Sequence, residues 1–199
     1  MPAPLKLGFL ASRGGTSMRA ILAAIDAGEL DAEARLVISN NADSAALAFA
    51  RERGLAALHV SGRTEGSAEA ADARIAAALT EAGVEQVICS GYLRPVGPRT
   101  LAAFEGRVLN IHPALLPAYG GQGMYGRRVH EAVVAAGERE TGATVHVVDA
   151  EYDHGPIVRQ RRIAIEPGDT AETIEARVMA AEPGLFIETL RALAGRSSG

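Results

Sequence analysis

The chain has 199 residues, of which 48% are hydrophobic and 22% are charged. This composition excludes an intrinsically disordered protein, and this length is enough to bury a full hydrophobic core. The net charge of −4 at pH 7 argues against a nucleic-acid-binding protein, because such proteins usually carry a basic surface.

Strand-like and helix-like segments alternate from the start of the chain. Short apolar runs predict strands at residues 5–11, 35–39, 57–60, 86–90 and 107–111. Apolar residues at helical spacing predict helices at residues 17–27, 44–53 and 68–82. The alternation is typical of an α/β fold with an open, mostly parallel Rossmann-like sheet and helices on both faces.

The last third of the chain changes character. Residues 143–148 and 157–165 predict two strands, which residues 149–156 join as an antiparallel pair. We therefore expect an antiparallel strand pair at the C-terminal end of the sheet.

A final helix follows this strand pair. Asp169 and Thr170 are suited to cap its start, and Pro183 should kink it. We expect one domain over residues 1–194 and a disordered tail over residues 195–199.

Cys89 is the only cysteine, which excludes an internal disulfide and favours a reducing compartment. Its apolar strand predicts a small core residue and not a nucleophile. No apolar run reaches the ~18 residues of a membrane span, and the N-terminal sequence lacks the layout of a signal peptide. We therefore expect a cytoplasmic protein with no membrane partner.

The turn at residues 12–17, Ser-Arg-Gly-Gly-Thr-Ser, lies between the first strand and the first helix. Free N–H groups at a helix N-terminus favour an anion, and glycine lets a phosphate approach closely. The glycine spacing fits neither a dinucleotide-binding motif nor a P-loop. Two interpretations stay open, a phosphate site and a tight turn with a Ser or Thr cap.

Asn110 and His112 end the predicted fifth strand, and Pro113 stops it. The two polar residues are two apart, so they point to the same side of the strand. An amide donor beside an imidazole can polarise a carbonyl and hold the oxyanion that forms when an amine attacks it. The alternative is a strand-end histidine with a structural hydrogen bond.

Asp153 opens the turn Asp-His-Gly-Pro before the last predicted strand. An aspartate at this position often caps its own turn. The functional hypothesis pairs it with His112, where its charge would stabilise the imidazolium and its oxygen would accept a proton from the amine.

Residues 120–126 contain four glycines, and such loops beside active sites often act as lids. The alternative is a solvent loop with no role. His59, His130 and His146 are interpreted as core or surface residues. No pair of histidines has the spacing of a zinc site, so no metal is predicted.

Taken together, these segments resemble the folate-dependent phosphoribosylglycinamide formyltransferases of the formyltransferase superfamily. The resemblance covers about residues 5–193. The segments that carry it are Asn-Ile-His-Pro-Ala-Leu-Leu-Pro at 110–117, the glycine loop through 124–126, Gly-Ala-Thr-Val-His at 142–146 and Asp-His-Gly-Pro at 153–156.

The resemblance implies a formyltransferase fold and a reaction of de novo purine biosynthesis. The formyl group of the co-substrate 10-formyltetrahydrofolate passes directly to the amine of glycinamide ribonucleotide, without a metal. By the same resemblance, Asn110 donates to the formyl oxygen, His112 stabilises the oxyanion, and Asp153 orients His112 and assists proton removal.

The resemblance also implies three groups of binding residues. The phosphate turn corresponds to Gly15, Thr16 and Ser17. The folate wall with its pterin contacts corresponds to Leu93, Arg94, Pro95 and Val96, with Asn110 and Asp149. The acid on the side of the substrate amine corresponds to Glu182.

The sequence departs from the family at two places. The usual turn reads Ser-Gly-x-Gly-Ser-Asn, whereas Arg13 and Ser17 here replace its first glycine and its asparagine. An arginine that family members often place against the folate tail aligns near Ala68.

Other functions with the same three residues stay open. Formyltetrahydrofolate deformylase gives the formyl group to water but normally carries an N-terminal regulatory domain, and the altered turn leaves room for another phosphorylated amine as acceptor. A methionyl-tRNA formyltransferase would need a further C-terminal domain. A non-enzymatic nucleotide-binding module would leave the three polar residues unexplained. The expected partners are two small-molecule substrates and no nucleic acid, in a monomer or homodimer.

Overall fold

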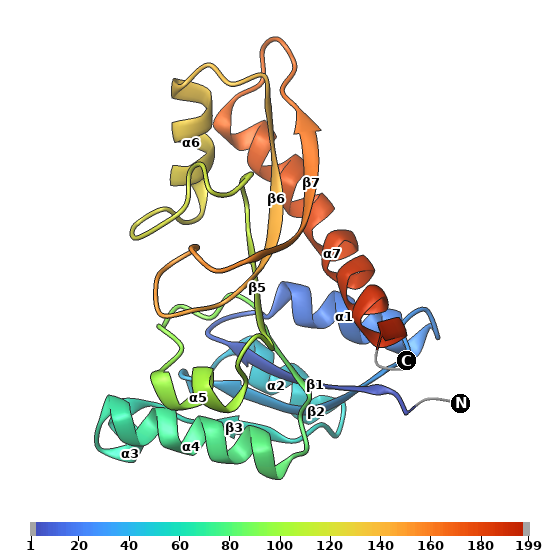
Figure 1. Cartoon of the computed structure of the whole chain (residues 1–199), viewed down its shortest axis with the longest axis vertical. Helices are drawn as coiled ribbons and strands as arrows, with labels where there is room; N and C mark the ends of the chain where they lie inside the picture. The colour runs from blue at the N-terminus through green and yellow to red at the C-terminus, as the bar shows by residue number, and fades with distance from the viewer. Residues whose placement is uncertain (1–2, 197–199) are drawn as a thin grey trace.

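The structure is a computed structural model that describes residues 3–196. Its strands form a seven-stranded sheet in the order β3-β2-β1-β4-β5-β6-β7 (Figure 1). They are β1 (Leu5–Ala11), β2 (Ala32–Ser39), β3 (Ala57–His59), β4 (Gln86–Cys89), β5 (Val108–His112), β6 (Glu140–Val147) and β7 (Ile157–Ala164). Strands β1 to β5 are parallel, whereas β6 and β7 each run antiparallel to the preceding strand. The predicted fold class is confirmed.

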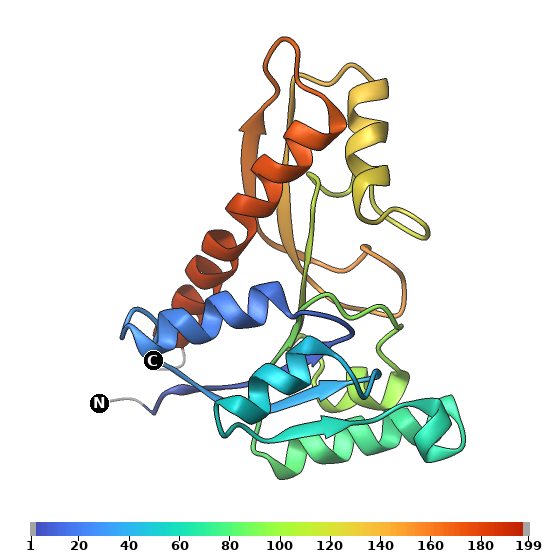
Figure 2. The same cartoon turned by 180° about the vertical axis from the view of Figure 1, so that it is seen from behind.

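Helices cover both faces of the sheet. They are α1 (Thr16–Asp26), α2 (Ala45–Glu52), α3 (Gly62–Glu65), α4 (Ala68–Glu81), α5 (Pro98–Ala103), α6 (Arg127–Ala135) and α7 (Ala171–Arg196). Side chains of α1, α2 and α7 pack into the hydrophobic core on one face, and those of α4 pack into the core on the other. Figure 2 shows α1, in blue, in contact with α7, in red.

The strand period of two explains how one sheet serves two cores. Leu7 and Phe9 of β1 lie in the core with α1 and α7, whereas Leu10 lies in the core with α4. Cys89 at the end of β4 is buried as expected, and burial raises the pKa of its thiol to about 12.

Most predicted elements agree with the structure. Strands β2 and β6 each begin three residues earlier than predicted, and helices α3, α5 and α6 were not among the predicted helices. The final helix α7 continues through Pro183 as one helix, and the kink expected at this proline stays a prediction. The helix also includes Gly195 and Arg196, which the sequence analysis assigned to a tail; residues 197–199 of that tail lie outside the described residues.

The topology places the functional segments at one edge of the sheet. The turns that follow β1, β4 and β5 all lie at carboxyl ends of parallel strands, where open α/β sheets bind ligands. Strand β6 runs antiparallel to β5, and the path of the loop between β6 and β7 brings Asp153 back to His112 at the end of β5. Figure 1 shows this loop, in orange, beside β5. Within residues 3–196, no helix is both long and apolar enough to cross a lipid bilayer.

Candidate active site

The end of β5 supplies two of the candidate catalytic side chains. In the antiparallel register with β6, Asn110 lies opposite His146 and His112 lies opposite Thr144. The Asn110 amide nitrogen is 3.3 Å from Nε2 of His146. His112 is only 3% exposed, so its ring is held by packing as well as by polar contacts.

Asp153 connects the polar side chains of β5 and β6. Its Oδ2 atom is 3.3 Å from Nδ1 of His112, and its Oδ1 atom is 3.5 Å from Nε2 of His146. Asp153 has a left-handed backbone with φ of 55°, a conformation that a non-glycine residue adopts at a cost in energy. The structure therefore brings the three predicted catalytic residues together, with the carboxylate between two imidazoles.

His146 belongs to this cluster, although the sequence analysis interpreted it as a core or surface residue. It is buried, and its ring contacts both Asn110 and Asp153. Antiparallel pairing of its strand with β5 would have indicated this contact, because pairing places residues of neighbouring strands opposite each other. The exact register, however, follows from the whole sheet and not from the local sequence.

The surroundings shift the pKa values of the cluster. Burial lowers the pKa of the His112 imidazole below its usual value, although the Asp153 carboxylate acts to raise it. Burial also acts to raise the pKa of Asp153, but the hydrogen bond with His146 and the charge of His112 outweigh it and leave the pKa below its usual value. Asp153 is therefore a carboxylate at neutral pH, poised beside a ring that loses its proton easily.

The beginning of the glycine loop closes over His112. The Tyr119 carbonyl oxygen lies 2.7 Å from Nε2 of His112; because a carbonyl only accepts, this nitrogen carries the proton. The Gly121 N–H donates to Asp153 at 3.1 Å. A Cβ on Gly120 would lie 2.5 Å from the Leu116 side chain and 3.1 Å from Cβ of Asp153, so glycine permits this close approach.

Two adjoining cavities lie beside the cluster. The smaller one, of about 100 Å³, is lined by Asn110, His146, Asp149 and Asp153 together with Arg94, Pro95 and Val96. The larger one, of about 910 Å³, extends from the loop after β4 to the ends of β2 and β3. Tyr92, Arg94, Pro95 and Val96 line both cavities.

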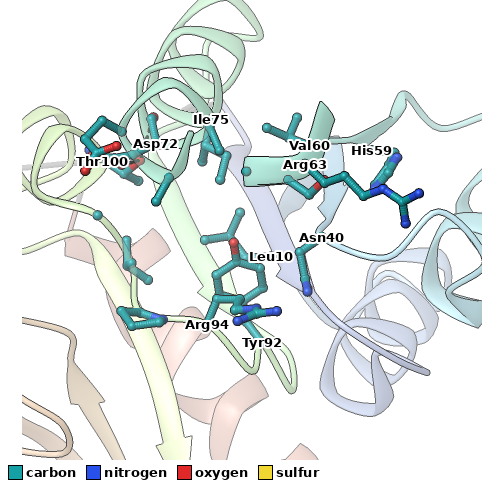
Figure 3. A pocket seen from close by; sticks show the side chains of 18 of the residues that line it. Leu10, Asn40, His59, Val60, Arg63, Asp72, Ile75, Tyr92, Arg94 and Thr100 are labelled. Atoms are coloured by element: carbon teal, nitrogen blue, oxygen red, sulfur yellow. Dashed lines mark hydrogen bonds between the residues drawn. The ribbon is translucent and has the colours of Figure 1, made fainter. Parts of the chain in front are cut away.

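Figure 3 shows the larger cavity from close by. Asp72 and Thr100 lie together on one side of it, whereas His59 and Arg63 lie on the other, and Tyr92 stands beside Arg94 between them. Leu93, expected in the folate wall, is 57% exposed and lines neither cavity.

The predicted phosphate turn forms the start of α1. Gly15 has a left-handed backbone with φ of 65° and gives the helix no side-chain cap. The Met18 N–H donates to the Ser90 hydroxyl at 2.9 Å. Among residues 3–196, the N–H groups of Thr16 and Ser17 have no hydrogen-bond acceptor.

Glu182 and the phosphate turn lie outside the two cavities. Glu182 is partly buried in α7, and burial raises its pKa to about 7. In the described part of the chain, no cluster of three or more His, Cys, Asp or Glu side chains is arranged to hold a metal ion.

The fold and the polar cluster agree with one known family. A family model described as formyl transferase matches residues 5–190, and the chain belongs to the formyl transferase family. Within it, the chain is 38% identical over 193 residues to a phosphoribosylglycinamide formyltransferase of Mycobacterium tuberculosis, covering 96% of this chain and 86% of that protein.

A solved structure shows the same architecture. Glycinamide ribonucleotide transformylase 1 from Symbiobacterium toebii superposes with a TM-score of 0.88 at 36% identity, covering 98% of this chain and 90% of that one. The chain is also 35% identical to a chloroplastic phosphoribosylglycinamide formyltransferase of Vigna unguiculata, over 94% of this chain but only 60% of that protein. It spans 66% of the corresponding protein of Arabidopsis thaliana.

Proposed function

We propose that this chain transfers the formyl group of 10-formyltetrahydrofolate to the primary amine of glycinamide ribonucleotide, a step of purine biosynthesis. The observation that carries the proposal is the Asp153 carboxylate held between His112 and His146 with the Asn110 amide beside it. The names of the relatives over most of their length support the same substrates.

The cluster suits an attack by an amine on a formyl carbon. The amine lone pair forms the new C–N bond, and the carbonyl electrons move to the oxygen as an oxyanion. Asn110 and His112 supply the N–H donors that stabilise such an oxyanion. As the intermediate collapses, the bond between the formyl carbon and N10 of the folate breaks and N10 takes a proton. The surplus proton of the amine leaves through Asp153, whose charge also stabilises the His112 imidazolium.

His112 needs a rearrangement before it takes this role. Its Nε2 proton is engaged by the carbonyl of Tyr119, the residue directly before the glycine loop, so a donor to the substrate oxyanion becomes available when Tyr119 moves with the loop. We therefore propose that residues 120–126 act as a lid whose position controls His112.

The donor, 10-formyltetrahydrofolate, occupies both cavities. The smaller cavity borders Asn110 and Asp153, which suits the pterin and the formyl group. A volume of about 100 Å³ is below the several hundred Å³ of a typical cofactor site, so the rest of the donor extends into the larger cavity. Arg63 and Arg94 line that cavity, where their guanidinium groups suit the carboxylates of the folate tail. Arg63 thereby offers a cation near Ala68, where the family arginine is missing.

The acceptor is assigned to the other side of the cluster. Its phosphate would lie at the start of α1, against the unpaired N–H groups and hydroxyls of Thr16 and Ser17. Gly15 provides the left-handed turn that starts α1, and the exposed Arg13 would add a cation. Glu182 would face the substrate amine.

The proposed function also includes the substrates, the lack of a metal and the cellular location. Both substrates are small molecules, the reaction uses no metal, and the protein acts in the cytoplasm without a nucleic-acid partner. The negative net charge and the single, buried cysteine support these expectations.

The experiment is a transfer assay with 10-formyltetrahydrofolate and a panel of acceptors. Formylated glycinamide ribonucleotide should be detected by mass spectrometry together with an equal amount of tetrahydrofolate. Tetrahydrofolate release without any amine would indicate a deformylase, and transfer only to another phosphorylated amine would replace the acceptor.

The phosphate site is tested separately by calorimetry. Glycinamide ribonucleotide should bind more tightly than its dephosphorylated riboside, and Gly15→Val should remove this difference. Gly28→Val controls for backbone strain alone, because Gly28 is also left-handed, with φ of 71°, but lies beyond the other end of α1 in open space, whereas a Cβ on Gly15 would lie 3.0 Å from the Met18 side chain. Equal binding of nucleotide and riboside would contradict the phosphate site.

A further inference from the structure

The position of one loop determines the shape of both cavities. This wall loop, residues 91–97, connects β4 to α5. Its Tyr92, Arg94, Pro95 and Val96 side chains line the small cavity and the large cavity alike. Any group that fixes the wall loop therefore fixes the wall that the two cavities of the proposed donor site share.

A buried carboxylate on α4 holds the far end of the wall loop. Asp72 is 7% exposed. Its Oδ2 atom accepts the Arg99 N–H at 2.7 Å, and its Oδ1 atom accepts the Thr100 N–H at 3.1 Å and the Thr100 hydroxyl at 2.6 Å. Figure 3 shows Asp72 and Thr100 together at the edge of the large cavity. Asp72 is thus bonded to a segment that lies 27 and 28 residues further along the chain.

These hydrogen bonds cap the N-terminus of α5 with a side chain from α4. Helix α5 begins after Gly97, which has no side chain and makes no cap hydrogen bond. The first N–H groups of a helix need acceptors from outside the helix, and a carboxylate is favoured there. Asp72 meets this need from another helix, and it thereby fixes where the wall loop ends.

The contact between Asp72 and the loop backbone is close. A Cβ on Gly97 would lie 2.1 Å from the carboxyl carbon of Asp72. Only glycine therefore fits at this point of the wall loop without displacing Asp72. The absence of a side chain at residue 97 and the carboxylate at residue 72 form a matched pair.

The near end of the wall loop has its own anchor. The Leu93 N–H donates to the Ser12 hydroxyl at 2.8 Å, and the Ser12 N–H donates to the Gly91 carbonyl at 3.2 Å. The residues between these two anchors, 94–96, face the cavities. With the Asp72 carboxylate removed, the far end of the loop would keep its apolar packing but lose the hydrogen bonds that the carboxylate accepts there.

We propose that Asp72 is a positioning residue for the formyl donor: it holds the wall loop in the shape that the folate requires. The proposal rests on the proposed function, because it assigns the wall loop to the donor. It separates the two substrates, since the start of α1, assigned to the acceptor, makes no contact with Asp72.

The test compares binding of tetrahydrofolate and the kinetics of both substrates in variants of the full chain. Asp72→Ala is expected to raise the Kd for tetrahydrofolate and the KM for 10-formyltetrahydrofolate about tenfold, which corresponds to ~1.4 kcal/mol. The KM for glycinamide ribonucleotide should stay within about twofold. Asp72→Asn keeps one accepting oxygen and should restore part of the donor affinity.

Ser67→Ala is the matched control. Ser67 caps the start of α4 by accepting the Ala70 N–H at 3.0 Å, and it is exposed. Its loss removes a helix cap from the same helix that carries Asp72, without touching the wall loop. This variant should lower Tm but leave the Kd for tetrahydrofolate unchanged. Hydrogen exchange over residues 92–100 should increase in Asp72→Ala and not in Ser67→Ala.

The outcomes separate the positioning role from the function itself. An unchanged Kd for tetrahydrofolate in Asp72→Ala, or an equal rise in KM for both substrates, would overturn the positioning role and leave the transferase assignment intact. A wild-type chain that does not bind tetrahydrofolate would overturn both. If Asp72→Ala does not fold, Asp72→Asn decides alone, and an unchanged Kd in that variant refutes the proposal.

Discussion

Replacing Glu182 with glutamine is expected to stabilise the protein more at pH 8 than at pH 5. The carboxyl is partly buried in α7, and in the described residues no cation or hydrogen-bond donor pairs with it. Burial raises its pKa from 4.5 to about 7. Between these two values the folded chain keeps a proton that the unfolded chain has lost, so stability falls as pH rises through this window.

The size of the effect follows from the pKa difference. One pKa unit corresponds to about 1.4 kcal/mol, so the interval from 4.5 to about 7 sets an upper limit of about 3.5 kcal/mol. Partial exposure screens the charge and reduces the expected value to roughly 1–2 kcal/mol. For a chain of this length, that corresponds to a Tm difference of roughly 3–6 °C.

Thermal unfolding at pH 5 and at pH 8 measures the difference. Wild type should lose Tm between the two pH values relative to Glu182→Gln, because glutamine cannot ionise. Glu172→Gln, an exposed position of the same helix, is the control and should follow wild type. Parallel Tm curves for wild type and Glu182→Gln would refute the argument that burial keeps this carboxyl protonated.

Three further predictions concern the catalytic residues and the glycine loop. Asn110→Ala and His112→Ala should each lower kcat by roughly 10²–10³, as expected for a lost oxyanion donor, with an unchanged circular dichroism spectrum; near wild-type kcat would contradict the catalytic assignment. Asp153→Asn should bind tetrahydrofolate like wild type in calorimetry but lose turnover, because the amide has no charge to stabilise an imidazolium; an unchanged rate would make Asp153 a turn residue only. The loop at residues 120–126 should resist limited proteolysis when both substrates are bound, because ordering its glycines costs entropy that the ligands must offset; equal cleavage with and without ligands would argue against a lid.

The sequence predicts the regular part of the fold because local patterns determine it. The apolar run of β1 predicts the observed bounds Leu5–Ala11. The helical spacing of apolar residues in α4 predicts the observed start at Ala68. The short helix α5 is different, since its first N–H groups are capped by Asp72 from another helix. A contact between residues so far apart in the chain leaves no local signal.

Helix α7 continues through a proline because of its tertiary packing. Pro183 lacks an N–H and is usually unfavourable inside a helix. The helix nevertheless continues, and its Leu185, Phe186 and Leu190 side chains are fully or almost fully buried against the sheet. Tertiary burial on this scale outweighs the local preference.

The site is predictable to the extent that its residues share a strand or a motif. Asn110 and His112 are adjacent on one side of β5, and the strand period alone indicates this. The contact of Asp153 with His112 depends on the path of the loop between β6 and β7. The place of His146 depends on the register of β6 against β5, which a single sequence does not specify.

His146 has two possible partners, and the state of its ring selects between them. Nδ1 lies 3.0 Å from the Val147 carbonyl, so it carries a proton. In the neutral ring, Nε2 accepts one amide hydrogen of Asn110 and leaves the other hydrogen for the formyl oxygen. In the protonated ring, Nε2 donates to Asp153 instead. Catalysis as proposed needs an oriented Asn110, and the contact of its amide nitrogen with Nε2 of His146 supplies that orientation.

His146 is therefore expected to affect catalysis by orienting the amide of Asn110. A neutral hydrogen bond contributes ~0.5–1.5 kcal/mol, so His146→Leu, which keeps most of the side-chain volume, should lower kcat roughly threefold to tenfold. The same substitution should have little further effect in an Asn110→Ala background, because residues that act through one contact are not additive. It should keep its full effect in an Asp153→Asn background. If the loss instead persists beside Asn110→Ala and disappears beside Asp153→Asn, His146 serves the carboxylate, and the amide of Asn110 is oriented by other means.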